Sequence, residues 1–75
     1  DFQAALAEAT QAVALCRETG EALELGIALR ILGEAYRANH QPQAAVTAFA
    51  ESVTVLGEDY PQELARTQAK MGLDE

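Results

Sequence analysis

Apolar residues recur every three or four positions along most of this 75-residue chain, a spacing that places them on one face of an α-helix. Four such runs are separated by short breaks rich in Gly, Pro, Asn and acidic residues. The pattern predicts an all-α fold with four helices at about residues 2–19, 21–38, 42–56 and 61–73. Because the connections are only a few residues long, neighbouring helices are expected to pack antiparallel. No stretch alternates convincingly enough to predict a strand.

Each predicted helix has one apolar stripe that faces the core. The stripe residues are Phe2, Leu6, Ala9, Val13 and either Leu15 or Cys16 in the first helix, Leu25, Leu29, Leu32 and Tyr36 in the second, Ala45, Phe49 and Val53 in the third, and Leu64, Met71 and Leu73 in the fourth.

Residues with known helix-end preferences lie at the predicted boundaries. Asp1 is available as an N-cap, and Gly20 suits the left-handed residue that ends a helix. Asn39, which tolerates positive φ, is expected to end the second helix. Pro42 and Pro61 fall at early helical positions, where the missing N–H costs nothing. The other boundary residues are Arg17 and Arg37 in last turns, Glu21 and Glu24 at the start of the second helix, Gly57 after the third, and Glu58 and Asp59 as N-terminal anions or a cap for the fourth.

The amino-acid composition and the net charge exclude some classes of binding partner. Hydrophobic residues make up 49 % of the chain and aromatic residues only 5 %, which is typical of helices that pack through small side chains. A formal net charge of −7 argues against binding to nucleic acids or anionic membranes, because both require a basic surface. No run reaches the roughly 20 apolar residues of a membrane span, and no signal peptide is recognisable. With a single cysteine and no internal disulfide, a reducing, cytoplasmic setting is expected.

The chain is small for an independent domain. A core of this size supplies about 3–5 kcal/mol of net stability. The sequence begins at Asp1, and the last periodic run has no closing element after it. We therefore expect residues 1–75 to form a single helical domain that is a segment of a longer protein.

Internal repetition links the two halves of the chain. Two matches are offset by 40 residues: Gln3-Ala4-Ala5-Leu6 with Gln43-Ala44-Ala45-Val46, and Val13 with Val53. Two further matches are offset by 39 residues: Glu24-Leu25 with Glu63-Leu64, and Leu32-Gly33 with Met71-Gly72. The first and third helices are therefore of one kind and the second and fourth of another.

The repeated helices carry the motif Leu29-x-x-Leu32-Gly33-x-x-Tyr36, followed by Ala45-x-x-x-Phe49-x-x-Ser52. This arrangement resembles a tetratricopeptide repeat, with Leu29 where the family has Trp. Small residues such as Gly33 let paired helices approach closely, while Tyr36 and Phe49 fill the wider gaps. The repeat length of about 39 residues exceeds the usual 34 and is similar to the longer units found in bacterial regulators and signalling ATPases.

The resemblance implies a fragment of a right-handed solenoid of stacked helical hairpins. In that frame the chain contains a half repeat at 1–20, a complete repeat at 23–57 and a second half repeat at 61–75. Since each repeat buries its apolar face against its neighbours, both ends are expected to expose apolar surface. Neighbouring repeats of the parent protein, or a second copy of the chain, are expected to cover these ends.

Candidate catalytic residues are few. His40 is the only histidine and lies in a turn, without the convergent partners that a metal site or an acid–base pair needs. Cys16 has no recognisable activating base and is interpreted as a small core residue. The glycines are too dispersed to form a phosphate-binding loop. The sequence therefore predicts no enzymatic activity, no metal and no cofactor.

The basic residues form a more informative set. By the resemblance, the concave face of the leading helices would bind a peptide or protein segment through Ile27, Arg30, Glu34, Arg37, Arg66 and Lys70. Four of the five basic residues belong to this set, so the expected partner segment is acidic. Arg66 and Lys70 resemble part of the carboxylate clamp of some family members, although Ile31 and Glu34 depart from it. The alternative is local ion pairing of Arg30 with Glu34, Glu34 with Arg37 and Glu63 with Arg66, at about 0.2–0.5 kcal/mol each.

Three functional hypotheses follow from the sequence. The first is a protein-interaction or scaffolding module that binds a partner segment on its concave face. The second is a structural element that self-associates through its apolar ends. The third is an accessory domain of a larger signalling or regulatory enzyme whose catalytic part lies elsewhere.

Overall fold

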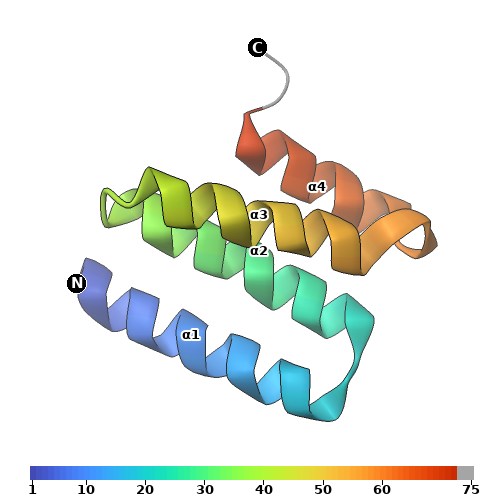
Figure 1. The fold of residues 1–75 in the computed structure, drawn as a ribbon, viewed down its shortest axis with the longest axis horizontal. Coiled ribbons are helices and arrows are strands. Elements are labelled where there is room, and N and C mark those ends of the chain that lie inside the picture. Colours follow the sequence, from blue (N-terminus) through green and yellow to red (C-terminus); the bar gives the residue numbers. More distant parts are fainter. Residues whose placement is uncertain (73–75) are drawn as a thin grey trace.

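The computed structural model describes residues 1–72, and this part of the chain is all-helical. Figure 1 shows α1 (Phe2–Thr19), α2 (Ala22–Ala38), α3 (Pro42–Leu56), the short 3₁₀ helix η1 (Gly57–Asp59) and α4 (Pro61–Met71). The prediction of four helices is confirmed, with α2 beginning one residue later than expected. The fourth helix ends at Met71, before the predicted boundary at residue 73, because Gly72 adopts a left-handed conformation with φ 75°. Leu73, predicted for the core stripe, lies outside the described residues.

The second helix is the centre of the molecule. α2 packs against α1, α3 and α4, and α3 also contacts α4. The colours in Figure 1 show that successive helices reverse direction, with α1 and α4 at opposite edges. In the described part of the chain, the backbone of α1 does not approach α3 or α4. None of these helices is long and apolar enough to cross a membrane.

The core lies mainly between α2 and α3. The fully buried apolar side chains are Leu29 from α2 and Phe49 and Leu56 from α3, each about 1 % exposed. α1 adds Ala9 and Val13, with Leu6 and Cys16 half-buried beside them. Of the two alternatives for the α1 stripe, Cys16 thus packs inward and Leu15 does not. Leu25, Tyr36, Val53, Leu64 and Met71 are half-buried, which places these stripe residues on the packed faces. The prediction for Phe2 is wrong, because this residue at the first turn of α1 is 59 % exposed.

Two glycines in α2 allow α3 to approach. A Cβ atom at Gly33 would lie 2.8 Å from two ring carbons of Phe49, which confirms the expected role of this small residue. Gly26 was not expected from the sequence to have a packing role, but the contact of its backbone with Leu56 is tighter than that of Gly33 with Phe49. A Cβ atom there would lie 2.3 Å from Cδ2 of Leu56. Leu56 and Phe49 therefore pack directly onto the backbone of α2.

A buried hydroxyl pair joins three helices. Ser52 on α3 donates a hydrogen bond of 2.7 Å to the carbonyl oxygen of Gly26 on α2. Its Oγ also lies 3.1 Å from Oγ1 of Thr67 on α4. Both side chains are 0 % exposed. Because the Ser52 hydroxyl donates its proton to the Gly26 carbonyl oxygen, the Thr67 hydroxyl is the donor in its hydrogen bond to Ser52 Oγ.

Most predicted helix ends are confirmed. The Asp1 carboxylate accepts a hydrogen bond from the Gln3 N–H, and Gly20 takes the left-handed conformation with φ 76°. Pro42 and Pro61 occupy early helical positions, and Gly57 caps α3. Of the two roles predicted for Glu58 and Asp59, that of a cap for the fourth helix is wrong, because both residues belong to η1 and Tyr60 is the N-cap residue. The side chain of Tyr60 makes no capping hydrogen bond.

The turn after α2 differs from expectation in one residue. Asn39 has φ −93°, whereas His40 takes the left-handed conformation with φ 61°. The N–H groups of His40 and Gln41 donate to the carbonyls of Arg37 and Tyr36, which is the hydrogen-bond pattern of a Schellman motif. This motif requires the left-handed residue one position after the cap. Asn39 is therefore the cap itself, and His40 reverses the chain.

Candidate protein-interaction surface

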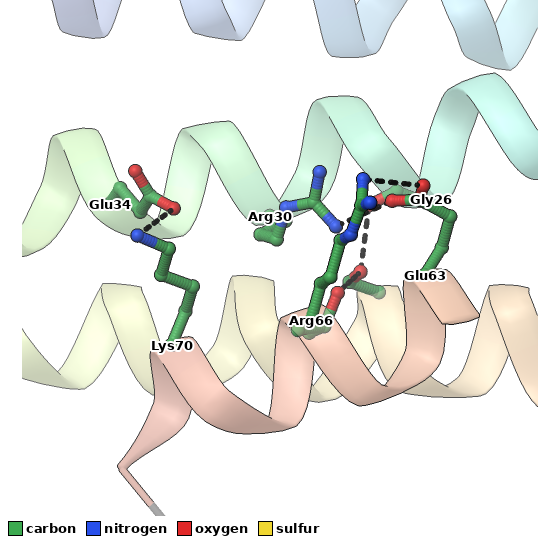
Figure 2. A network of polar contacts seen from close by, with 8 residues as sticks. Gly26, Arg30, Glu34, Glu63, Arg66 and Lys70 are labelled. Atoms are coloured by element: carbon green, nitrogen blue, oxygen red, sulfur yellow. Dashed lines mark hydrogen bonds and ion pairs between the residues drawn. The ribbon is translucent and has the colours of Figure 1, made fainter. Parts of the chain in front are cut away.

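Charged residues of α2 and α4 pair across the interface between these helices in two groups, Arg30–Glu63–Arg66 and Glu34–Lys70, shown in Figure 2. The Glu63 carboxylate on α4 accepts a hydrogen bond of 2.8 Å from Arg30 on α2 through Oε1 and one of 3.1 Å from Arg66 through Oε2. Lys70 Nζ on α4 lies 3.8 Å from Oε2 of Glu34 on α2. We call these five side chains the α2–α4 network. They bring together Arg30, Glu34, Arg66 and Lys70, four of the six predicted binding residues.

The predicted local ion pairs are only partly present. Glu63 and Arg66 pair within α4 as expected. Arg30 pairs with Glu63, and Glu34 with Lys70, so the expected pairs of Glu34 with Arg30 and with Arg37 are wrong. The reason is that α4 lies beside α2 and offers these side chains partners across the interface.

The two remaining predicted residues lie outside the network. Ile27 lines a pocket of about 370 Å³ together with Leu23, Tyr60 and Glu63, so it adjoins the network through Glu63. The Arg37 guanidinium lies 5.0 Å from the centroid of the Phe49 ring, in the range of a cation–π contact. Arg37 is therefore directed toward α3. Ile31, which was not included in the predicted set, is 51 % exposed on α2.

The network is unevenly exposed, and the pKa of its Glu63 carboxyl is shifted. The hydrogen bond from Arg30, together with the charges of Arg66 and Arg30, lowers the pKa of Glu63 below its ordinary value. The side chain of Arg30 is 13 % exposed and that of Arg66 is 67 % exposed. Three cations and two anions leave the network with one net positive charge. Arg66 and Lys70 can therefore offer N–H donors to an acidic group from solvent, while Arg30 is largely covered.

A second polar bridge connects α1 to α3. Arg17 donates to both carboxylate oxygens of Glu51, at 2.6 and 2.9 Å. This hydrogen bond lowers the pKa of Glu51 and raises that of Arg17. The bridge borders a groove of about 400 Å³ over α2, lined by Leu29, Leu32 and Tyr36 among others. The sequence identified Arg17 only as a last-turn residue, since nothing local indicates its pairing with Glu51.

The structure also places the residues considered for chemistry. His40 is exposed in its turn, and Cys16 is half-buried against the α2 side of the core. Within residues 1–72, no group of three or more His, Cys, Asp and Glu side chains lies close enough to hold a metal ion. At the start of α2, a hydrogen bond with the Glu21 carboxyl raises the pKa of Glu24. The negative charge of Glu21 adds to this rise, and both side chains are exposed.

Comparison with protein-family models, curated proteins and solved structures found no match. The tetratricopeptide resemblance therefore depends on the motif around Gly33 and Phe49 and on the internal repetition of the sequence.

Proposed function

We propose that this chain is a protein-interaction module of tetratricopeptide-like repeats, which binds an acidic segment of a partner protein on the face formed by α2 and α4. The observation that supports it best is the convergence of Arg30, Arg66 and Lys70 from two helices onto one surface. Three of the five basic residues of an otherwise acidic chain gather there. Guanidinium groups match the geometry of carboxylates, which favours an acidic partner segment.

Two further features fit this proposal. The contact between α2 and α4 is compatible with leading helices that line one face of a curved array. The pocket beside Ile27 offers the apolar side chains of Leu23, Ile27 and Tyr60 next to the charged network, and its other lining residues include Asp59 and Glu63. Its apolar part would hold the apolar side chains of a partner segment, while Arg66 and Lys70 face the acidic ones. A reducing cytoplasmic setting, suggested by the lone Cys16, forms part of the proposal.

Titration with an N-acetylated hexaglutamate peptide tests this function. The net charge of −7 repels such a peptide at long range, so binding at low salt requires a local cationic site. We expect nuclear magnetic resonance titrations to show binding of hexaglutamate and not of hexaglutamine. Arg66→Gln should weaken the binding by about fivefold, the size of an exposed charge-assisted contact.

Arg17→Gln is the matched control, since it removes one arginine from the α1–α3 bridge instead of the α2–α4 network. It should leave the affinity for hexaglutamate unchanged. Equal effects of the two substitutions, or no preference for hexaglutamate over hexaglutamine, would refute the proposed face.

The exposed side chains of α1 favour a second candidate function, self-association. Phe2 and Leu15 are 59 % and 62 % exposed, and α2 is the only described helix whose backbone approaches that of α1. If these residues mediate self-association, the wild-type chain should sediment as a dimer at high concentration. Leu15→Glu should then shift the mass to that of a monomer without loss of helix, because a charge is costly in an apolar contact. A wild-type chain that is monomeric at all concentrations would exclude this candidate.

A further inference from the structure

The Glu63 carboxylate is held as a bound ligand carboxylate would be. Each of its two oxygens accepts a hydrogen bond from a different guanidinium, at 2.8 Å from Arg30 and 3.1 Å from Arg66. The two arginines come from different helices, and Figure 2 shows both reaching the same carboxylate. Convergent guanidinium groups of this kind form a site for one carboxylate or phosphate. In this chain the site is filled by one of its own side chains.

The filled site remains accessible from one side. Arg66 is 67 % exposed, whereas the Glu63 side chain is 20 % exposed. An incoming carboxylate can therefore reach Arg66 from solvent, but it reaches Arg30 only when Glu63 moves away. Glu63 itself lines the pocket of about 370 Å³, together with Ile27, Asp59 and Tyr60. This open space beside Glu63 leaves room for its side chain to move.

The charge of Glu63 favours its place between the two arginines. Its pKa is lowered by the hydrogen bond from Arg30, so the carboxyl is ionised well below neutral pH. The Arg66 side of the site is 67 % exposed, and an exposed ion pair of this kind is weak enough to exchange with an external anion. The Arg30–Glu63 pair is largely covered, at 13 % and 20 % exposure, and is the contact that displacement must break. Removing the Glu63 charge raises the net positive charge of the α2–α4 network from one to two, which strengthens its attraction for an external anion.

We propose that Glu63 is an internal competitor for the carboxylate site between Arg30 and Arg66, so that it sets the affinity of the α2–α4 face for an acidic segment. A partner carboxylate binds between the two arginines by displacing Glu63. This inference rests on the proposed function and adds a regulatory element to it. Apparent affinity falls in proportion to the small fraction of molecules in which the site is open, and removal of the competitor restores it.

A purely structural role predicts a different outcome. If Glu63 only fastens α2 to α4, its removal loosens α4 and leaves the affinity for anions unchanged or lower. Glu63→Gln separates these roles. The glutamine amide keeps the size of the side chain and one acceptor oxygen for Arg30, but it competes weakly for two guanidinium groups because it is neutral.

The test compares Glu63→Gln with Glu58→Gln in the hexaglutamate titration. Both variants remove one negative charge, but Glu58 is exposed in η1 and makes none of the ion pairs of the described residues. We expect Glu63→Gln to bind hexaglutamate about fivefold more tightly than Glu58→Gln. The Nε–Hε resonances of Arg30 and Arg66 should shift on titration of Glu63→Gln, which reports binding at the site itself. Glu63→Ala, which removes the acceptor entirely, should give the same gain if the helical circular dichroism signal is retained.

The outcomes distinguish this inference from the proposed function. If the wild type binds hexaglutamate and Glu63→Gln binds no more tightly than Glu58→Gln, the internal competitor is refuted and the proposed face stands. If the wild type, Glu63→Gln and Glu63→Ala all fail to bind, both are refuted. Binding by Glu63→Gln that does not shift the Arg30 resonance also contradicts the inference, because displacement must expose that arginine.

Discussion

Gly26→Ala is expected to lower the free energy of unfolding by about 2 kcal/mol, because the added methyl group overpacks the contact between α2 and α3. A Cβ atom at this position would lie 2.3 Å from Cδ2 and 2.4 Å from Cγ of Leu56. The Cγ atom is the branch point of a side chain that is 1 % exposed, so relief requires the whole side chain or the helix to move. Overpacking of this kind costs about 1–3 kcal/mol or more and exceeds the helix propensity that alanine gains over glycine. Urea unfolding followed by far-ultraviolet circular dichroism measures the change.

Ala50→Gly is the matched control for helix propensity. Ala50 is exposed in the middle of α3, so replacing it with glycine should cost about 1 kcal/mol without any change in packing. Gly33→Ala should also be destabilising, since its Cβ would lie 2.8 Å from the Phe49 ring. If Gly26→Ala instead stabilises the chain by the amount that Ala50→Gly costs, the two helices are farther apart than the structure indicates.

Ser52→Ala is expected to destabilise the chain by about 2 kcal/mol, because it leaves buried polar groups without a partner. The Ser52 hydroxyl donates to the carbonyl of Gly26 and lies within hydrogen-bond distance of the Thr67 hydroxyl. Both Ser52 and Thr67 are completely shielded from water, so solvent cannot replace the lost bonds in the folded state. The same bonds connect α4 to α2 and α3, and amide hydrogen exchange in α4 should accelerate in the variant.

Thr54→Ala is the matched control for loss of a hydroxyl. Thr54 is exposed on the same helix, where its hydroxyl donates to the carbonyl of Ala50. Its removal should change stability by less than about 0.5 kcal/mol. In a double-mutant cycle, Ser52→Ala and Thr67→Val should cost less together than the sum of the single changes, because they remove one shared hydrogen bond. An effect of Ser52→Ala no larger than that of Thr54→Ala would contradict the buried hydroxyl pair.

The helices and their ends followed from local features of the sequence. The spacing of apolar residues is the spacing of a helical face, and it located α1 and α3 to the residue. Helix ends marked by Gly20 and Pro42 were equally clear, because the backbone preferences of these residues do not depend on the rest of the fold. The turn after α2 was harder. Asn39 has the stronger left-handed preference, but the hydrogen bonds of the turn place that conformation at His40.

The candidate surface was only partly predictable. A helical wheel groups Arg30 with Glu34 on α2, and Arg66 with Lys70 on α4, because side chains three or four residues apart share a face. It does not determine which of them meet across helices. The pairing of Arg30 with Glu63, and the direction of Arg37 toward Phe49, both depend on how α4 and α3 lie against α2.

Local spacing and turn chemistry thus specified the four helices and their apolar stripes, since each depends on residues within one or two turns. The glycine at Gly33, repeated at Gly72, was read directly from the sequence. The packing of whole helices decided the rest. It brought Leu56 against Gly26, enclosed Ser52 with Thr67 and placed Glu63 between two arginines. Apart from the local Glu63–Arg66 pair, these contacts join residues 15 to 33 positions apart in the chain. The relative register of the helices determines which residues meet. The register is set by the interlocking of all the packed side chains together, so no single stretch of the sequence encodes it.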